Sequence, residues 1–229
     1  MKTDNQDTSN NKAFKKGMAI QEAYERIKHL ISVNQLVPGQ KLIYGNLAKK
    51  LNMGVTPVIQ ALNRLEASGI VSYEANKGYF VGEITEAEVR QLYQAREALE
   101  IFIVPLIIEN ITPNDVKKIR QQFVQRKDAR MSRREMILED IRFHLAIARY
   151  ARNDVIYNLL ENIFEQVYLK YRPEYFEDYR IKEILSEHSK LLKHLINGDA
   201  NESIALITHH SRTGLDYLLK TIQTERSGF

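Results

Sequence analysis

One pair of side chains in the second half of the sequence has the types and the spacing of metal ligands. Asp140 and His144 are four residues apart, so on a helix they lie on one face and can hold one ion together. His188 and His210 lie in two further segments that are predicted to be helical. An Asp-x-x-x-His pair is frequent by chance, however, and a histidine is more often packed or at the surface than a ligand. The pair alone therefore leaves metal binding and ordinary packing open.

A second candidate site surrounds a helix that begins near Thr56 and ends near Gly69. Thr56 can cap this helix, with Pro57 at the first helical position, where its missing N–H costs nothing. Apolar residues at helical spacing give the helix a core-facing side. They are Val58, Ala61, Leu62 and Leu65.

Polar residues near this helix have the chemistry of nucleic-acid contacts. The amides of Gln60 and Asn63 can each pair with adenine through two hydrogen bonds. Lys49, Lys50 and Arg64 can contact phosphates, which position a protein without reading the base sequence. Simple solvation of Gln60 and Asn63 is the alternative.

The elements around this helix predict a winged helix-turn-helix domain over residues 17–82. Apolar residues between Ile20 and Ile31 recur at helical spacing, and residues 46–51 form a short helix. Two β-rich runs then flank a polar tip at Asn76–Lys77–Gly78, which is typical of a hairpin. The second helix of such a motif enters the major groove, and the hairpin wing, through Lys77 and Gly78, reaches DNA beside it. The polar residues 1–16 are expected to form a flexible tail.

Residues 83–229 predict an all-α bundle, so the fold class is mainly α. Thr85 to Glu88 form a capping box at the start of a long helix, which Pro105 is expected to kink or end. Thr112 to Asp115 start another helix, and Asn197–Gly198 separates two more. No strand pattern follows residue 82.

The composition separates the two domains by charge. Residues 1–82 hold 11 Lys and Arg against 6 Asp and Glu, whereas residues 83–229 hold 22 against 23. A basic module joined to a neutral one indicates that the first part meets a polyanion. The absence of cysteine excludes disulfides and thiolate zinc sites. Because no secretion signal or membrane span is found either, a cytoplasmic protein without membrane contact is expected.

The sequence resembles the GntR family of bacterial transcription regulators. The segments "LVPGQKL" and "LAKKLNMGVTPVIQALNRLEASGIVSYEANKGYFV" resemble its winged helix, while "DIRFHLAIARYARND" and "EHSKLLKHLINGD" look like the FCD domain of its FadR branch. The similarity runs from about residue 18 to 222. It implies a homodimer on a near-palindromic DNA operator, with a small-molecule effector inside the bundle.

The resemblance also implies a metal site and an effector site. In metal-binding members of the family, residues matching Asp140, His144, His188 and His210 coordinate a divalent cation. Three imidazoles and one carboxylate suit Zn²⁺, Ni²⁺, Fe²⁺ or Mn²⁺ and argue against Ca²⁺ or Mg²⁺. His209 is the alternative to His210.

Arg96 matches an arginine that the family often points into the same cavity, where it can bind the carboxylate of a small organic acid through a bidentate fork. A surface arginine paired with Glu100 is the alternative.

Positions that are commonly basic in the family are uncharged here, namely Gly45, Val55 and Ile59. Since a Val or Ile in the groove can pack on a thymine methyl group, we expect an operator richer in A·T rather than lost DNA binding. The chain is expected not to be an enzyme. A metal-dependent hydrolase and a DNA-binding protein without a ligand remain the alternatives.

Overall fold

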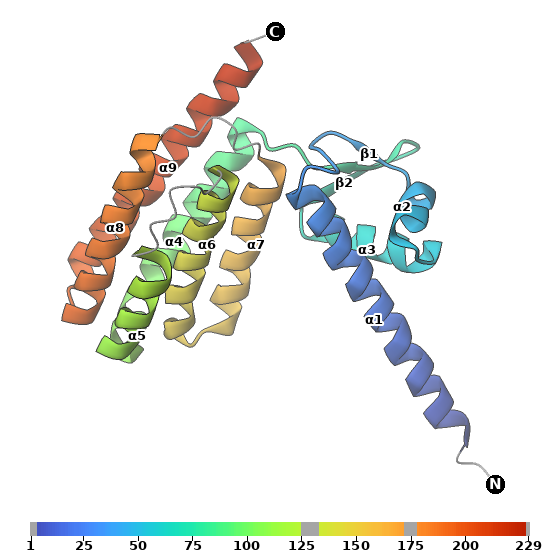
Figure 1. Cartoon of the computed structure of the whole chain (residues 1–229), viewed down its shortest axis with the longest axis horizontal. Coiled ribbons are helices and arrows are strands. Elements are labelled where there is room, and N and C mark those ends of the chain that lie inside the picture. Colours follow the sequence, from blue (N-terminus) through green and yellow to red (C-terminus); the bar gives the residue numbers. More distant parts are fainter. Residues whose placement is uncertain (1–3, 125–132, 172–177, 228–229) are drawn as a thin grey trace. The chain divides into compact units, whose positions relative to one another are not determined.

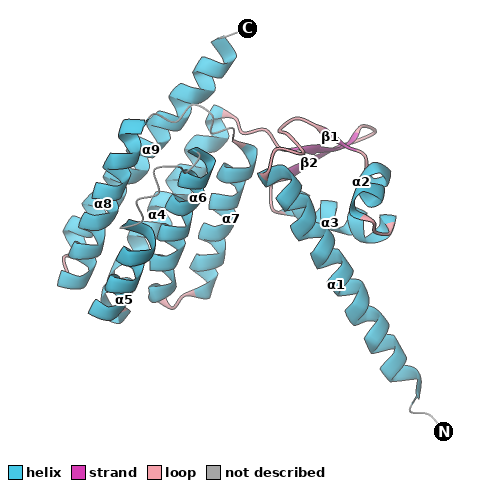
Figure 2. Ribbon diagram, in the orientation of Figure 1, coloured by secondary structure: helices cyan, strands magenta, loops and turns pink. Residues whose placement is uncertain are grey.

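The computed structural model describes residues 4–124, 133–171 and 178–227. The residues up to Glu83 form one compact unit, and most of the residues from Ile84 onward form a second. Within the described residues, the first unit combines helices with a small sheet, and the second consists of helices (Figure 2).

The first unit is the predicted winged helix-turn-helix. Its elements are α1 (Asp4–Ser32), β1 (Lys41–Leu42), α2 (Tyr44–Leu51), α3 (Val55–Ala67), β2 (Val71–Glu74) and β3 (Gly78–Val81). The strands form an antiparallel sheet in the order β1-β3-β2, with Lys41 opposite Phe80 and Val71 opposite Val81. Helices α2 and α3 are the helix-turn-helix, and β2 with β3 is the wing. Ile27 of α1 and Leu62 of α3 are fully buried in its apolar core.

Three details of this unit differ from the sequence prediction. Helix α3 begins at Val55 with Gly54 as its N-cap, so Thr56 is not the cap. Pro57 thus lies at the third helical position, which it tolerates because the first N–H groups of a helix have no intrahelical partner. Strand β1 is missing from the prediction because two residues are too few to show an alternating pattern.

The third difference concerns the expected flexible tail over residues 1–16. Helix α1 begins at Asp4, and residues 1–3 lie outside the described residues. A helix nucleated by the packed residues from Ile20 onward extends at low cost, because each added residue gains one hydrogen bond.

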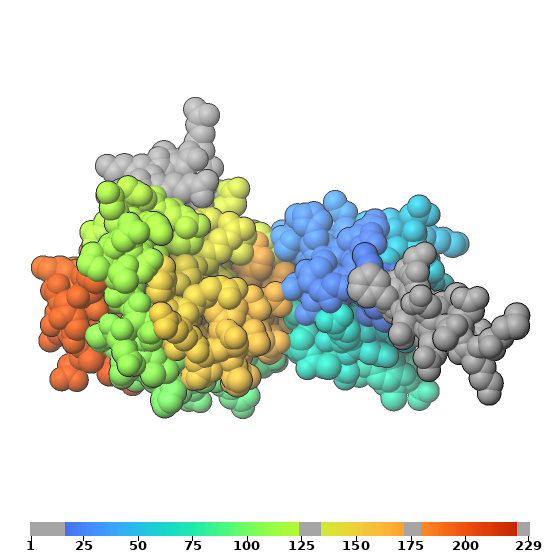
Figure 3. All heavy atoms as spheres, turned by 90° about the horizontal axis from the view of Figure 1, so that it is seen from below, coloured from blue at the N-terminus to red at the C-terminus, as the bar shows by residue number. Residues whose placement is uncertain are grey.

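The second unit is an all-α bundle, and within the described residues no strand follows Val81. Its helices are α4 (Glu86–Asn110), α5 (Pro113–Ile119), a short π-helical turn (Arg120–Val124), α6 (Arg133–Ala148), a 3₁₀ turn (Arg149–Ala151), α7 (Asp154–Lys170), α8 (Asp178–Asn197) and α9 (Ala200–Ser227). Helix α4 packs against α6, α8 and α9 (Figure 1). Val104, Phe143 and Leu192 are fully buried in its core. The side chains of α5, α6 and α7 cover the face of the bundle seen in Figure 3.

The predicted helix ends of the bundle are confirmed at three places. The Thr85 side chain accepts the Glu88 N–H at the start of α4, and Thr112 and Asp115 form a capping box before α5. Gly198, at a φ of 78°, separates α8 from α9.

Pro105 does not end α4, which continues to Asn110. Because Pro105 is exposed, water can satisfy the carbonyl that the proline leaves without a partner four residues earlier. Among the described helices, none combines the length and the apolarity needed to cross a membrane.

Candidate metal centre and nucleic-acid interface

Four side chains from three helices converge in the bundle. Helix α6 carries Asp140 and His144 one turn apart, α8 carries His188, and α9 carries His210. One ligand atom from each lies within 4.8 Å of the other three. The three histidines are buried and Asp140 is nearly so, with side-chain exposures of 3%, 4%, 7% and 16% for His144, His188, His210 and Asp140.

The distances within this cluster match those between ligands that share one ion. Asp140 Oδ1 lies 3.0 Å from His188 Nε2, 3.5 Å from His210 Nε2 and 3.7 Å from His144 Nε2. The Nε2 atoms of His144 and His210 are 3.1 Å apart. Tetrahedral bonds of the length found for zinc and nitrogen place neighbouring ligand atoms about 3.3 Å apart. The cluster therefore fits a four-ligand site for a first-row ion.

Two of these atoms lack a hydrogen bond although they are buried. Within the described residues, neither Asp140 Oδ1 nor His188 Nε2 forms one with acceptable geometry. A buried polar atom without a partner costs about 1–3 kcal/mol. A cation bound between them would satisfy both atoms, so this observation also fits a metal.

A carboxylate stands behind each of two imidazoles. Glu100 of α4 lies 2.6 Å from His144 Nδ1, and Glu187 of α8 lies 2.6 Å from His210 Nδ1. Such a partner holds the proton on Nδ1 and turns Nε2 toward the centre, as in known metal sites. The third imidazole is held differently, because the His188 ring stacks on Phe143 with 3.7 Å between centroids.

An arginine in turn pairs with each carboxylate. Arg96 Nε donates to Glu100 at 2.8 Å, and Arg180 donates two hydrogen bonds to Glu187. Burial raises the pKa of Glu100, but Arg96 and His144 outweigh it and lower that pKa to about 2. Burial likewise raises the pKa of Glu187, but His210 and Arg180 outweigh this effect and lower that pKa to about 2. Both groups are therefore charged at neutral pH.

The ionisation of the converging groups suits cation binding. Burial lowers the pKa of His144, and it lowers the pKa of His188 to about 4, so both imidazoles are neutral near pH 7. Burial opposes the charge of Asp140, yet His210 and His144 hold the pKa of its carboxyl well below the usual value. Burial also lowers the pKa of His210, but Asp140 and Glu187 raise it overall. A cation bound at this point would compete with the proton whose binding to His210 the nearby carboxylates favour.

Arg96 combines features of both interpretations made from the sequence. It pairs with Glu100, but it is buried at 5% exposure rather than lying at the surface. Its guanidinium carbon lies 4.7 Å from the centre of the Phe164 ring. Within the described residues its Nη2 has no hydrogen-bond partner. This buried donor is therefore available to an acceptor such as a carboxylate.

Sequence reasoning missed Glu187 and considered Glu100 only as a partner of a surface arginine. The signal for Glu187 was its place beside His188, which is too common an arrangement to stand out alone. His209 is 62% exposed and lies outside the cluster, although its Nε2 is 3.6 Å from Glu187. The structure thus brings together the four residues that the resemblance implies.

On the winged helix, the first turn of α3 presents an apolar side chain to solvent. Val55 is 43% exposed, Thr56 beside it is exposed, and Ile59 is half-buried. Gln60 is also half-buried, and within the described residues its Oε1 has no hydrogen-bond partner. Lys49 is exposed at the end of α2. A groove facing this turn would therefore meet methyl groups, a hydroxyl and one amide.

Two of the residues predicted to contact DNA also have hydrogen-bond partners within the domain. The Tyr79 hydroxyl of the wing donates to Asn63 Oδ1, and the Tyr79 ring packs on Tyr73 with 5.0 Å between centroids. Arg64 donates to Gln21 of α1 at 2.9 Å, and its guanidinium carbon lies 4.8 Å from the centre of the Tyr24 ring.

The predicted wing contacts lie at its tip. Lys77 is exposed, and its Nζ lies 2.7 Å from Glu74 Oε2. Gly78 begins β3 at a φ of 97°, a conformation that glycine adopts readily.

Residues 19–81 match the family described as "Bacterial regulatory proteins, gntR family", and residues 91–213 match the FCD domain. The chain belongs to the GntR family. Its FCD domain places this GntR regulator in the FCD-containing, FadR-like branch.

The chain is similar to several regulators of this family. It is 29% identical to the HTH-type transcriptional regulator McbR of Escherichia coli (strain K12) over 60% of this chain and 63% of McbR, which is less than two thirds of that protein. It is 25% identical to the Nta operon transcriptional regulator of Aminobacter aminovorans over 81% of this chain and 88% of that protein. The solved structure of E. coli McbR/YncC has the same fold, with a TM-score of 0.77, 24% identity and coverage of 89% of this chain and 98% of that chain. The GntR family and these relatives are transcriptional regulators, so the chain is a regulator and not the hydrolase considered from its ligand types.

Proposed function

We propose that this GntR regulator binds DNA in response to a small organic acid, which its bundle recognises with a divalent transition metal. The observation that carries the proposal is the convergence of Asp140, His144, His188 and His210 on one point. The carboxylates behind two of the imidazoles support it, because they orient nitrogen lone pairs toward that point. The ligand types favour Zn²⁺, Ni²⁺, Fe²⁺ or Mn²⁺.

Arg96 supports a carboxylate as the effector. When bound, the metal supplies a Lewis-acidic centre that accepts carboxylate oxygens. The charges of Arg96 and Asp140 act on each other, so the guanidinium lies within electrostatic range of the metal ligands. Its Nη2, which has no hydrogen-bond partner among the described residues, can donate to the effector while Nε stays on Glu100. We propose that Arg96 orients the acid by donating to one of its carboxylate oxygens.

Helix α4 is the proposed link between sensing and DNA binding. It carries Arg96 and Glu100, and only four residues separate its start at Glu86 from the last strand of the winged helix. An effector that binds one arrangement of α4 better than another shifts the equilibrium by that difference in affinity alone. In a homodimer, a change at α4 in both chains would alter the spacing of the two reading helices on a near-palindromic operator.

We propose that Thr56, Gln60, Lys49, Lys77 and Gly78 contact DNA, whereas Asn63 and Arg64 hold the reading surface together. The exposed side chain of Val55 favours thymine methyl groups, so the proposed operator is rich in A·T. Selection of bound sequences from a random DNA pool tests this proposal. We expect A·T pairs at the half-site centre, and a strict requirement for G there contradicts the proposal.

Calorimetry tests the sensing proposal. Citrate is titrated into protein stripped with EDTA and into protein reloaded with Zn²⁺. We expect binding to the loaded protein to be at least about tenfold tighter, and the Arg96→Met variant to lose most of that gain, because a charged hydrogen bond contributes about 1.5–3 kcal/mol. Equal affinity of a panel of organic acids for the stripped and loaded proteins overturns the proposal.

A further inference from the structure

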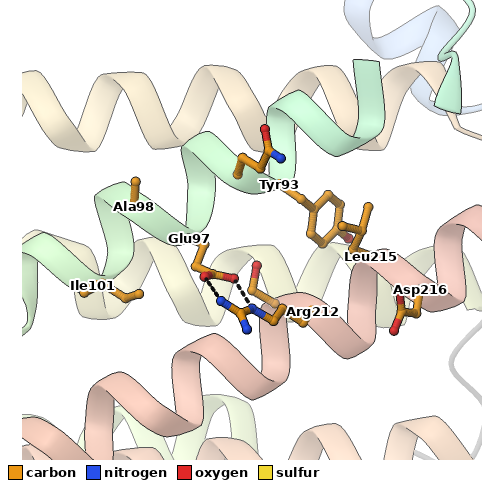
Figure 4. A pocket seen from close by; sticks show the side chains of 9 residues that line it. Tyr93, Glu97, Ala98, Ile101, Arg212, Leu215 and Asp216 are labelled. Carbon is orange, nitrogen blue, oxygen red and sulfur yellow. Dashed lines mark hydrogen bonds and ion pairs between the residues drawn. The ribbon is translucent and has the colours of Figure 1, made fainter. Parts of the chain in front are cut away.

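A groove runs along the outer junction of α4 and α9. It encloses about 480 Å³, and its lining includes Tyr93, Glu97, Ser211, Arg212 and Leu215. Figure 4 shows Arg212 and Glu97 paired across it, with the Tyr93 ring reaching toward Leu215. Arg212 donates to Glu97 through two nitrogens, at 3.0 and 3.3 Å, and is itself 68% exposed. An ion pair open to solvent therefore bridges the groove.

Tyr93 lines this groove and also lies beside Arg96, the partner of Glu100. On one side its ring lines the groove, and on the other the ring centre lies 5.5 Å from the Arg96 guanidinium carbon. Burial raises the pKa of the Tyr93 hydroxyl, and the charges of Arg96 and Asp140 also act on it. One aromatic side chain thus faces both the groove and the buried Arg96.

Ser211 is a second part of the same wall. It follows the candidate ligand His210 directly and lines the groove. Its side chain is 1% exposed, and within the described residues its Oγ has no hydrogen-bond partner. A buried hydroxyl in this position can exchange hydrogen bonds with a polar molecule as it passes.

We propose that the α4–α9 groove is the entrance by which the metal ion and the small acid reach the centre, with Tyr93 as the gate. The Glu97–Arg212 ion pair holds α4 and α9 together at the mouth and so restricts opening. This inference rests on the proposed function, because it presupposes an ion at the centre.

A substitution at Gly214 can restrict the movement of the Tyr93 ring. A Cβ atom built at Gly214 lies 3.4 Å from Tyr93 Cε1 and 3.6 Å from its hydroxyl oxygen. Both are ordinary contact distances, so alanine fits there and limits the movement of the ring. Since Gly214 lies within α9, alanine also suits the helix better.

The experiment measures how fast Zn²⁺ leaves and enters the full chain, using the chromogenic chelator 4-(2-pyridylazo)resorcinol for release and a fluorescent zinc indicator for uptake. Arg212→Ala is expected to speed both directions by about fivefold, the size expected for one exposed ion pair. Gly214→Ala is expected to slow both. Because an entrance changes rates and not the bound state, the equilibrium affinity stays the same in both variants. Arg26→Ala, which removes an exposed ion pair with Glu22 in α1, is the control and leaves the rates unchanged.

Two results overturn the inference while the proposed function survives. Unchanged rates in both variants show that the ion takes another path. If a substitution changes the release rate but not the uptake rate, the affinity changes as well, and these residues stabilise the bound ion instead. If the wild-type chain binds none of Zn²⁺, Ni²⁺, Fe²⁺ and Mn²⁺, the proposed function fails, and the entrance fails with it.

Discussion

The two units of this chain place their polar residues in opposite ways. Among the described residues, the buried side chains up to Glu83 are apolar, whereas the second unit buries histidines, arginines and carboxylates. The winged helix keeps its amides, hydroxyls and lysines near the surface around α3 and the wing. The bundle instead encloses Asp140, three histidines and two arginine–carboxylate pairs. A surface that reads DNA needs polar groups outside, and a chamber that selects a small ion needs them inside.

This difference has an energetic consequence. A buried charge is stable only when it is paired, and removing one partner of a buried pair costs about 3–5 kcal/mol. Substitutions in the bundle interior should therefore affect both binding and folding, while those on the winged-helix surface should affect DNA binding alone. The expected effects on binding therefore decrease from the converging side chains of the bundle to the reading surface of the winged helix.

The largest effect is expected from removing one of the four converging side chains. His210→Ala takes away an imidazole ligand and is expected to weaken Zn²⁺ binding by more than about a hundredfold, beyond the loss seen for residues that only support ligands. Competition titration of the full chain measures this affinity. His209→Ala is the matched control, because this neighbouring histidine is exposed and is not one of the four converging residues. Equal losses in the two variants contradict the assignment of the site.

A smaller loss is expected for the carboxylates behind the imidazoles. Glu187→Gln keeps the shape but replaces the charged acceptor at His210 Nδ1, and Zn²⁺ affinity should fall about 10- to 100-fold. Glu100→Gln should act similarly through His144. Glu183→Gln provides the control, because Glu183 contacts Arg180 but touches no histidine of the cluster. If Glu187→Gln binds Zn²⁺ as tightly as wild type, the carboxylate does not support the site.

On the reading surface, variants of Asn63 and Tyr79 test whether Asn63 reads a DNA base or holds the wing in position. Tyr79→Phe removes only the hydroxyl that donates to Asn63, and operator affinity should fall by about fivefold, the equivalent of one hydrogen bond. If Asn63 holds the wing, Asn63→Ala has the same effect, and the double variant adds nothing. Fluorescence anisotropy on the operator and on single-base variants measures both. Loss of adenine discrimination in Asn63→Ala alone identifies Asn63 as a base reader.

The smallest effect concerns acid stability at the start of α5. Hydrogen bonds from Thr112 lower the pKa of Asp115. A carboxyl whose pKa is lowered by folding stabilises the folded state at pH values above its pKa in the unfolded chain. This contribution is lost as the pH falls through its pKa in the folded state. Thr112→Val should therefore raise the Asp115 pKa toward 3.8. An NMR titration of the side-chain carbonyl measures the shift, and an unchanged pKa shows that the capping box does not cause it.

The sequence predicted the elements better than it predicted their convergence. Helix caps such as Thr85 and Thr112 depend on residues a few positions apart, and a local pattern is sufficient to find them. The Asp140–His144 pair is also local. That His188 and His210 lie beside it depends on the packing of three helices, and only the resemblance to the family indicated it. The contacts of Asn63 with the wing and of Arg64 with α1 join distant segments, so an exposed position on α3 gave no sign of them.

Anomalous diffraction at the absorption edge of the metal in crystals of the full chain tests the central claim most directly. The account predicts a single anomalous peak in the bundle of each chain, within bonding distance of Asp140, His144, His188 and His210. A metal-loaded crystal in which no peak lies among these side chains, or in which they bind only one another, contradicts it.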